Sequence, residues 1–206
     1  MNPPSVIESV ESSSVTTGSP SPFAPNWQKV MMWVFIVTDA LLFAGFLGSY
    51  GFVRLASTSW PDRSEVFNLR LIALMTFVLI SSSATMASAV AAARRSDRRM
   101  LVRFLILTVL GGFCFLGLQA YEWSNLIREG ATLHSNPWGV PVFTASFFLI
   151  TGFHGSHVLT GLIVLLITTF RSASGRSTSE GVEVAGLYWH FVDLVWVFIF
   201  TFFYLV

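Results

Sequence analysis

The chain has 206 residues, of which 53% are hydrophobic and only 11% are charged, and its mean hydropathy is +0.67. This composition is that of an integral membrane protein and excludes an ordinary soluble domain. The formal net charge is +1, and the Lys and Arg residues lie between the apolar stretches rather than in one patch, so nothing points to a nucleic-acid partner.

Residues 1–26 form a polar segment rich in serine and proline. Their apolar content is too low to support a hydrophobic core, so we expect a disordered N-terminal tail. A segment that becomes ordered against a neighbouring subunit is the alternative. Residues 27–206 are expected to form the membrane domain.

Five apolar stretches are long enough to cross a bilayer as α-helices. They cover approximately residues 28–53, 69–93, 101–123, 142–170 and 185–206. The connections between them are short and leave no room for a second folded domain. The predicted fold is therefore all-α, an integral membrane bundle of five transmembrane helices.

The positive charges predict the orientation of this bundle. If the N-terminus is cytoplasmic, eight of the 12 Lys and Arg residues fall inside, the densest group being residues 94–103, and four fall outside. Short cytoplasmic loops usually carry the excess of Lys and Arg. We therefore expect a cytoplasmic N-terminus and an external C-terminus. The first stretch is too long for a signal-peptide core and is expected to remain as a helix.

Ionisable side chains interrupt three of these helices. A charged group at the bilayer centre costs roughly 2.5–3.5 kcal/mol on insertion scales, so such residues usually face other helices and pair. We expect the first, fourth and fifth helices to converge on a buried polar cluster, which serves either as an inert hydrogen-bonded clasp or as a proton-exchanging or gating group. The residues of this predicted cluster are Asp39, His154, His157, His190 and Asp193.

A metal site is the alternative to a hydrogen-bonding role for two of these histidines. His154 and His157 lie three residues apart on one helical face, a spacing at which two imidazoles can share a metal ion. The remaining histidines are His134, in a loop, and His190, so a full ligand set is not evident. We expect hydrogen bonds between helices and no metal in this chain.

Other polar and small residues suggest structural roles. Gln119, Glu122 and Glu183 are expected to be polar residues at the membrane interface. Small residues let helix backbones approach closely, so we expect helix packing at Gly48, Gly152 and Ser156. The third and fifth helices, which carry many bulky apolar residues, are expected to turn broad surfaces to lipid or to a large partner.

Two motifs resemble those of a known family. Residues 151–161 read Thr-Gly-Phe-His-Gly-Ser-His-Val-Leu-Thr-Gly, and residues 188–193 read Tyr-Trp-His-Phe-Val-Asp, preceded by Gly-Val-Glu at 181–183. In this order they resemble the signature of cytochrome c oxidase subunit III of the haem–copper oxidases. Residues 119–123, Gln-Ala-Tyr-Glu-Trp, are similar to the family's Gln-x-x-Glu-Tyr, and residues 35–39, Phe-Ile-Val-Thr-Asp, to its Phe-Ile-x-Ser-Glu. The resemblance covers about residues 28–206.

The resemblance implies an accessory subunit of the bacterial cytoplasmic membrane without cofactors of its own. Its implied partners are the catalytic oxidase subunit I, which carries the haems and copper, other respiratory-complex subunits and phospholipid. The implied roles are stabilising the catalytic subunit during turnover, assisting proton uptake and admitting oxygen. The chain resembles the short form that lacks the first two helices of the longest members. It departs from the family at Asp39, where Glu is usual.

Other functions remain open. The equivalent subunit of a quinol oxidase or a nitric-oxide-reductase accessory protein fits equally, because the electron-donor site lies in other chains. A freestanding proton-coupled transporter is an alternative of another class. Inverted repeats and broken helices would favour a transporter, and the sequence shows neither.

Overall fold

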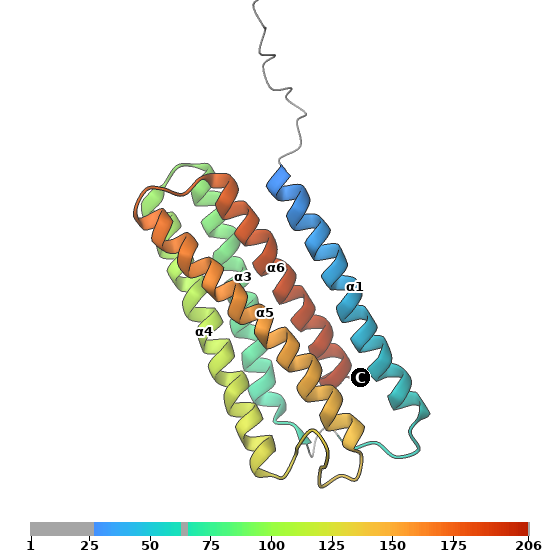
Figure 1. Cartoon of the computed structure of the whole chain (residues 1–206). Coiled ribbons are helices and arrows are strands. Elements are labelled where there is room, and N and C mark those ends of the chain that lie inside the picture. Colours follow the sequence, from blue (N-terminus) through green and yellow to red (C-terminus); the bar gives the residue numbers. More distant parts are fainter. Residues whose placement is uncertain (1–26, 63–65, 206) are drawn as a thin grey trace, which may run out of the picture.

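The computed structural model describes residues 27–62 and 66–205, which form helices and no strand (Figure 1). The elements are α1 (Trp27–Ala56), α3 (Leu69–Arg94), α4 (Arg98–Arg128), α5 (Pro141–Ala173), α6 (Ser179–Phe200) and the short π-helix η1 (Thr201–Leu205), which continues α6. In this described part, five helices are long and apolar enough to cross a membrane. The predicted all-α, five-span fold is thereby confirmed. The predicted tail, residues 1–26, lies outside the described residues.

The helices extend beyond the apolar stretches that predicted them. Helix α4 begins at Arg98 rather than near residue 101, and α6 begins at Ser179 rather than near residue 185. The side chains of Asn68, Asp97 and Thr178 accept backbone N–H groups in the first turns of α3, α4 and α6. These N-caps satisfy donors that have no partner within a helix. Hydropathy alone does not detect such polar first turns.

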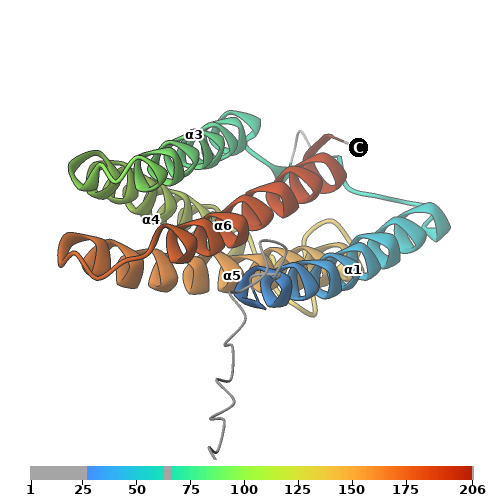
Figure 2. The same cartoon turned by 90° about the horizontal axis from the view of Figure 1, so that it is seen from above.

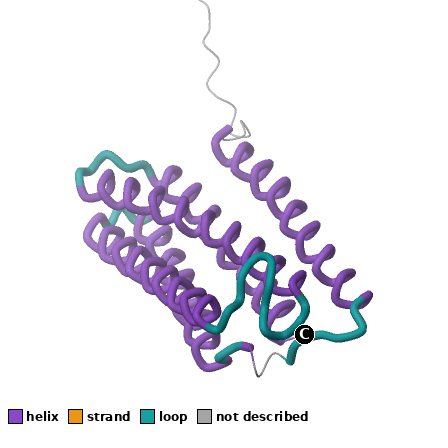
Figure 3. Tube along the Cα trace, turned by 60° about the horizontal axis from the view of Figure 1, so that its bottom comes forward, coloured by secondary structure: helices purple, strands orange, loops and turns teal. Residues whose placement is uncertain are grey.

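The helices alternate in direction along the bundle. Helices α3 and α4 form an adjacent pair, α6 lies centrally against α3, α5 and α1, and α1 stands at one edge (Figures 1 and 2). The starts of α1, α4 and α6 and the ends of α3 and α5 meet at one end of the bundle, called here the arginine-rich end. Its basic residues are Lys29, Arg94, Arg95, Arg98, Arg99, Arg171 and Arg176. The α4–α5 loop, residues 129–140, lies at the opposite end (Figure 3).

Two adjacent glycines on α4 set how closely the helices approach. A Cβ atom on Gly111 would lie 2.7 Å from the Cβ of Ser82 on α3. On Gly112 it would lie 2.6 Å from Leu162 of α5 and 2.7 Å from the indole of Trp189 on α6. The sequence had suggested a broad outward surface for this helix. Its outer face does expose bulky apolar residues such as Ile106 and Leu110, whereas its glycine side packs against three other helices, because only Gly leaves room for them.

The residues predicted to serve helix packing lie in different surroundings. Gly152 lies under the indole of Trp123, where a Cβ would come within 3.0 Å of a ring carbon. A Cβ on Gly48 would meet no atom within 4 Å. Ser156 is exposed, and its hydroxyl donates to the Phe153 carbonyl, 2.6 Å away in the same helix. A packing role for Gly48 and Ser156 would therefore need a neighbour outside the described chain.

Replacing Gly111 tests the close approach of α3 and α4. We expect Gly111→Ala to lower the free energy of unfolding by about 1–3 kcal/mol, because the added methyl overpacks against Ser82. Gly117→Ala, on the same helix, is the matched control, since its Cβ would meet no atom within 4 Å. Thermal unfolding midpoints of the two variants in detergent provide the measurement. Equal midpoints would contradict the packing described here.

Candidate functional site

A carboxyl and an imidazole meet between α1 and α5 inside the apolar part of the bundle. Asp39 Oδ2 lies 3.4 Å from His157 Nε2, and the two side chains are 9% and 14% exposed. The other imidazole nitrogen, Nδ1, is 2.9 Å from the carbonyl of Phe153, one turn earlier in α5. This contact joins the edge helix α1 to the rest of the bundle.

The geometry of His157 constrains the proton between the two side chains. A carbonyl only accepts hydrogen bonds, so Nδ1 must donate its proton to Phe153. Nε2 can then face Asp39 favourably in two arrangements. Either Nε2 carries a proton and Asp39 is a carboxylate, or Nε2 is unprotonated and the Asp39 carboxyl carries the proton. In either arrangement the pair holds one proton, on Nε2 or on the carboxyl, although at 3.4 Å Oδ2 makes no well-formed hydrogen bond among the described residues. The contact can therefore exchange a proton without either side chain leaving its helix.

The third helix at this level is α6. The hydroxyl of Tyr188 donates to the backbone carbonyl of His157 over 3.1 Å. On the other side, the Phe43 ring lies edge-on to the imidazole, with ring centroids 5.6 Å apart. These contacts restrict the imidazole to one orientation and limit the access of water to it.

His154 lies one turn from His157 but in wholly aromatic surroundings. It is fully buried, and neither ring nitrogen has a hydrogen-bond partner among the described residues. Its ring centroid is 5.9 Å from that of Phe115 and 5.4 Å from that of Trp196. The Phe43 ring contacts both imidazoles, with centroid distances of 6.4 and 5.6 Å, but among the described residues only His157 has a polar side chain facing it.

A second polar group joins α6 to α3. The Ser83 hydroxyl is 2.6 Å from His190 Nδ1. One turn further along α6, Asp193 is 6% exposed and lies near the same serine, although neither carboxyl oxygen makes a well-formed hydrogen bond. None of the ion pairs or hydrogen bonds among residues 27–62 and 66–205 joins this group to Asp39.

The five residues expected to form one cluster are thus divided among three places. Asp39 and His157 lie between α1 and α5, His154 lies in an aromatic cage, and His190 and Asp193 face α3. The division arises because residues on opposite sides of α5 or α6 face different neighbours, which sequence spacing alone does not reveal. The role of Ser83 was missed, although its position in a run of three serines inside an apolar helix was a usable signal.

Glu122, expected at the membrane interface, has its side chain inside the bundle. Glu122 and Gln119 are each 5% exposed. The Tyr204 hydroxyl, in η1, lies 3.2 Å from both carboxyl oxygens of Glu122, and the Gln119 amide is 3.5 Å from one of them. The partner lies 82 residues away in the sequence. No local pattern could have indicated that pairing.

Glu183, the third predicted interfacial residue, joins three helices at the arginine-rich end. Its Oε1 accepts a hydrogen bond from Arg94 Nε at 2.7 Å, and its Oε2 pairs with the ammonium of Lys29. The three residues belong to α6, α3 and α1. Because one carboxylate receives two cations, it holds the start of the edge helix against the bundle.

A bound metal ion needs several ligand side chains that converge on one point. Within residues 27–62 and 66–205, no group of three or more His, Cys, Asp or Glu side chains converges closely enough to hold one. The chemistry that the polar side chains offer there is hydrogen bonding and proton exchange.

Comparison with known proteins finds relatives along most of the chain. A model of the family described as cytochrome c oxidase subunit III matches residues 8–206. A Corynebacterium diphtheriae protein named cytochrome c oxidase subunit 3 is 35% identical over 182 residues, which are 85% of this chain and 86% of the relative. A Mycobacterium bovis protein named probable cytochrome c oxidase subunit 3 is 36% identical over 186 residues, with 88% and 89% covered. A Staphylococcus saprophyticus protein named probable quinol oxidase subunit 3 is 31% identical over 185 residues, with 88% and 90% covered.

The pairing of Glu122 with Tyr204 is tested by a double-mutant cycle. We expect Tyr204→Phe to cost about 1–3 kcal/mol of unfolding free energy, because it removes a donor from a buried carboxyl. In a Glu122→Leu background the same change should cost clearly less. Tyr121→Phe, beside Glu122 but 57% exposed, is the control and should have little effect. Additive costs in the cycle, measured by thermal unfolding, would show that the two groups do not interact.

Proposed function

The chain belongs to the cytochrome c oxidase subunit III family, and on that premise we propose that it is a non-catalytic subunit without a cofactor of its own. As a haem–copper oxidase subunit III, it is part of a respiratory oxidase complex, and its five helices fit a multi-pass protein of a bacterial membrane. The proposed partner is the catalytic subunit that holds the haems and copper. The proposed roles are to stabilise that subunit during turnover and to assist its proton uptake and oxygen access.

The contact between Asp39 and His157 is the observation that carries the proposal. It brings together two ionisable groups that could exchange a proton in the apolar interior, one of them on the helix that the rest of the described chain surrounds least. A purely structural clasp needs no ionisable pair there, and ionisable residues inside membranes usually mark function. Asp in place of the family's Glu shortens the side chain by one methylene, and the shorter carboxyl faces His157.

A route for protons from the arginine-rich end supports the same role. A cavity of about 580 Å³ is lined by Lys29, Arg94, Glu183 and His190. Glu183 lies near its charged end, and His190 lies two turns deeper on α6. We propose that this cavity admits water to His190, from which Ser83 leads towards Asp193.

The outward faces of the bundle suit a large apolar partner. Between α1 and α6 lies a cavity of about 440 Å³ lined by residues such as Phe43, Leu47, Gly48 and Phe198, all of them apolar. We propose that lipid or the catalytic subunit covers this surface, and that oxygen, being apolar, reaches the catalytic subunit along it. This would also give Gly48 the neighbour that it lacks within the chain.

A quinol oxidase is the second candidate complex. The Staphylococcus saprophyticus relative, which is named probable quinol oxidase subunit 3, is the observation that favours this alternative. The polar sites described above are compatible with either electron donor, because the proposed functions concern protons and oxygen.

Purification through a tag on this chain tests the proposed partnership. In mild detergent we expect a large catalytic subunit and haem absorbance to co-purify, because the apolar outer faces need a partner. Mass spectrometry of the electron-entry subunit then identifies the donor. A colourless, solitary protein in several detergents would overturn the proposal and favour a freestanding transporter.

Asp39→Asn separates a proton-linked role from a structural clasp. We expect the complex to keep its full subunit content, because Asn retains the size and hydrogen-bonding capacity of Asp. Proton uptake should slow, or inactivation during turnover should quicken, because the amide cannot exchange the proton. Thr38→Val is the control, since Thr38 is exposed and its hydroxyl bonds only backbone carbonyls of α1.

Two other results for Asp39→Asn would decide between the proton-linked role and the structural clasp. Normal uptake and normal turnover stability in a fully assembled Asp39→Asn complex would refute the proton-linked role. Loss of the subunit from the complex would show instead that the ionisable carboxyl is required to hold α1 in place.

A further inference from the structure

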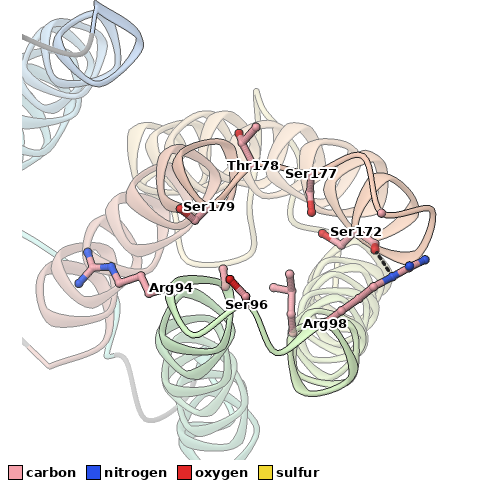
Figure 4. A pocket seen from close by; sticks show the side chains of 10 residues that line it. Arg94, Ser96, Arg98, Ser172, Ser177, Thr178 and Ser179 are labelled. Atoms are coloured by element: carbon pink, nitrogen blue, oxygen red, sulfur yellow. Dashed lines mark hydrogen bonds between the residues drawn. The ribbon is translucent and has the colours of Figure 1, made fainter. Parts of the chain in front are cut away.

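A polar cavity at the arginine-rich end is not used by any function described above. It has a volume of about 330 Å³ and lies among the ends of α3 and α5 and the starts of α4 and α6 (Figure 4). Its polar lining includes Arg94, Ser96, Arg98, Ser172, Ser177 and Ser179. Four helix ends therefore line one space, with the hydroxyls of Ser172 and Ser177 directed into it and the guanidinium groups of Arg94 and Arg98 turned outward at its two sides.

One hydroxyl in this cavity lacks a partner. Ser172 is 1% exposed, and its Oγ makes no hydrogen bond within the described part of the chain. Figure 4 shows its side chain directed into the cavity, toward the side from which Ser177 also points inward. Buried hydroxyl groups are nearly always hydrogen-bonded, because leaving one unpaired is costly. Ser172 is therefore positioned for a ligand rather than for a neighbour in the fold.

The charges around the cavity favour an anion. Arg94 and Arg98 line it, and no Asp or Glu is among its lining residues. Among the neighbouring acidic residues, Asp97 accepts the Met100 N–H as the N-cap of α4, and Glu183 is paired with Lys29 and Arg94. Glu180, in the first turn of α6, follows the lining residue Ser179 but does not line the cavity itself. The start of α6 adds the positive end of a helix dipole and the N–H groups of its first turn.

The helix C-termini at this end do not cancel that preference. The last carbonyls of α5 would present partial negative charge, but Arg98 donates to the carbonyls of both Ser172 and Ala173. A guanidinium has five N–H donors, so Arg98 keeps donors for a ligand after making these contacts. Arg98 thus neutralises the carbonyl end of α5 and holds a positive charge beside the cavity.

We infer that this cavity binds a phosphate group. Serine hydroxyls, guanidinium groups and a helix N-terminus are the donors that phosphate oxygens take in proteins. The cavity lies at an end of the bundle where membrane headgroups gather, and basic pockets between membrane helices bind anionic headgroups. The phosphate can come from an anionic lipid headgroup or from free phosphate in solution.

Binding to the purified full-length chain tests the site. After delipidation in detergent, native mass spectrometry measures the affinity for two probes, dioctanoyl phosphatidylglycerol and inorganic phosphate. Ser177→Glu places a carboxylate in the cavity, and we expect it to weaken binding at least about tenfold, because the carboxylate repels an anionic ligand. Ser172→Ala removes only the unpaired hydroxyl and should weaken binding less, without a loss of stability.

Ser174→Glu is the matched control, because it adds the same charge three residues away on a serine outside the cavity lining. We expect it to bind both probes as the unaltered chain does. Loss of phosphatidylglycerol binding alone identifies a lipid headgroup as the ligand, and loss of inorganic phosphate binding identifies free phosphate. Unchanged binding in both cavity variants, or equal weakening in Ser174→Glu, would overturn the inference.

Discussion

The constraint on which this structure depends is that a polar side chain among apolar helices must find its partner on another helix. Water does not reach such groups, and an unsatisfied polar atom is costly in this setting. The central helix α6, with η1, meets the constraint for much of the bundle. Its side chains form hydrogen bonds with three other helices. The pairs are Tyr188 with His157, Trp189 with Ser82, His190 with Ser83, Trp196 with Thr76 and Tyr204 with Glu122. These contacts specify which face of α6 meets α3, α4 and α5.

Close packing and polar pairing depend on one another at Trp189. Its indole reaches Ser82 only because Gly112 and Gly161 leave space on either side, where Cβ atoms would come within 2.7 and 3.0 Å of the ring. Apolar contact alone is a weak guide to helix association in lipid, because the tails are as apolar as the side chains. The bundle therefore uses small residues to bring helices together and hydroxyls to fix their rotation.

The polar sites differ in position, and this matters for function. Asp39 and His157 lie at the edge helix α1, whose outer face is broadly exposed, whereas Glu122 and Tyr204 are enclosed near the opposite end of the bundle. An edge position leaves the first pair close to the surface that a partner could cover, while an enclosed position suits a structural contact. The proposed proton-linked role therefore rests on Asp39 and His157 at α1, and on Ser83, His190 and Asp193 between α3 and α6. The proposed phosphate cavity is a different site, at the arginine-rich end.

The sequence by itself determined the membrane class, the five spans, their approximate limits and the family. Hydropathy and helix length are local properties, and the motifs at 151–161 and 188–193 are contiguous, so no tertiary contact was needed to recognise them. The tertiary structure decided which polar residues meet. It separated His154 from His157, brought Tyr204 to Glu122 across 82 residues, and gathered Ser96, Ser172 and Ser177 around one cavity. Helical rotation and packing set these relations, since a turn of about 100° per residue sends close neighbours in sequence to different helices.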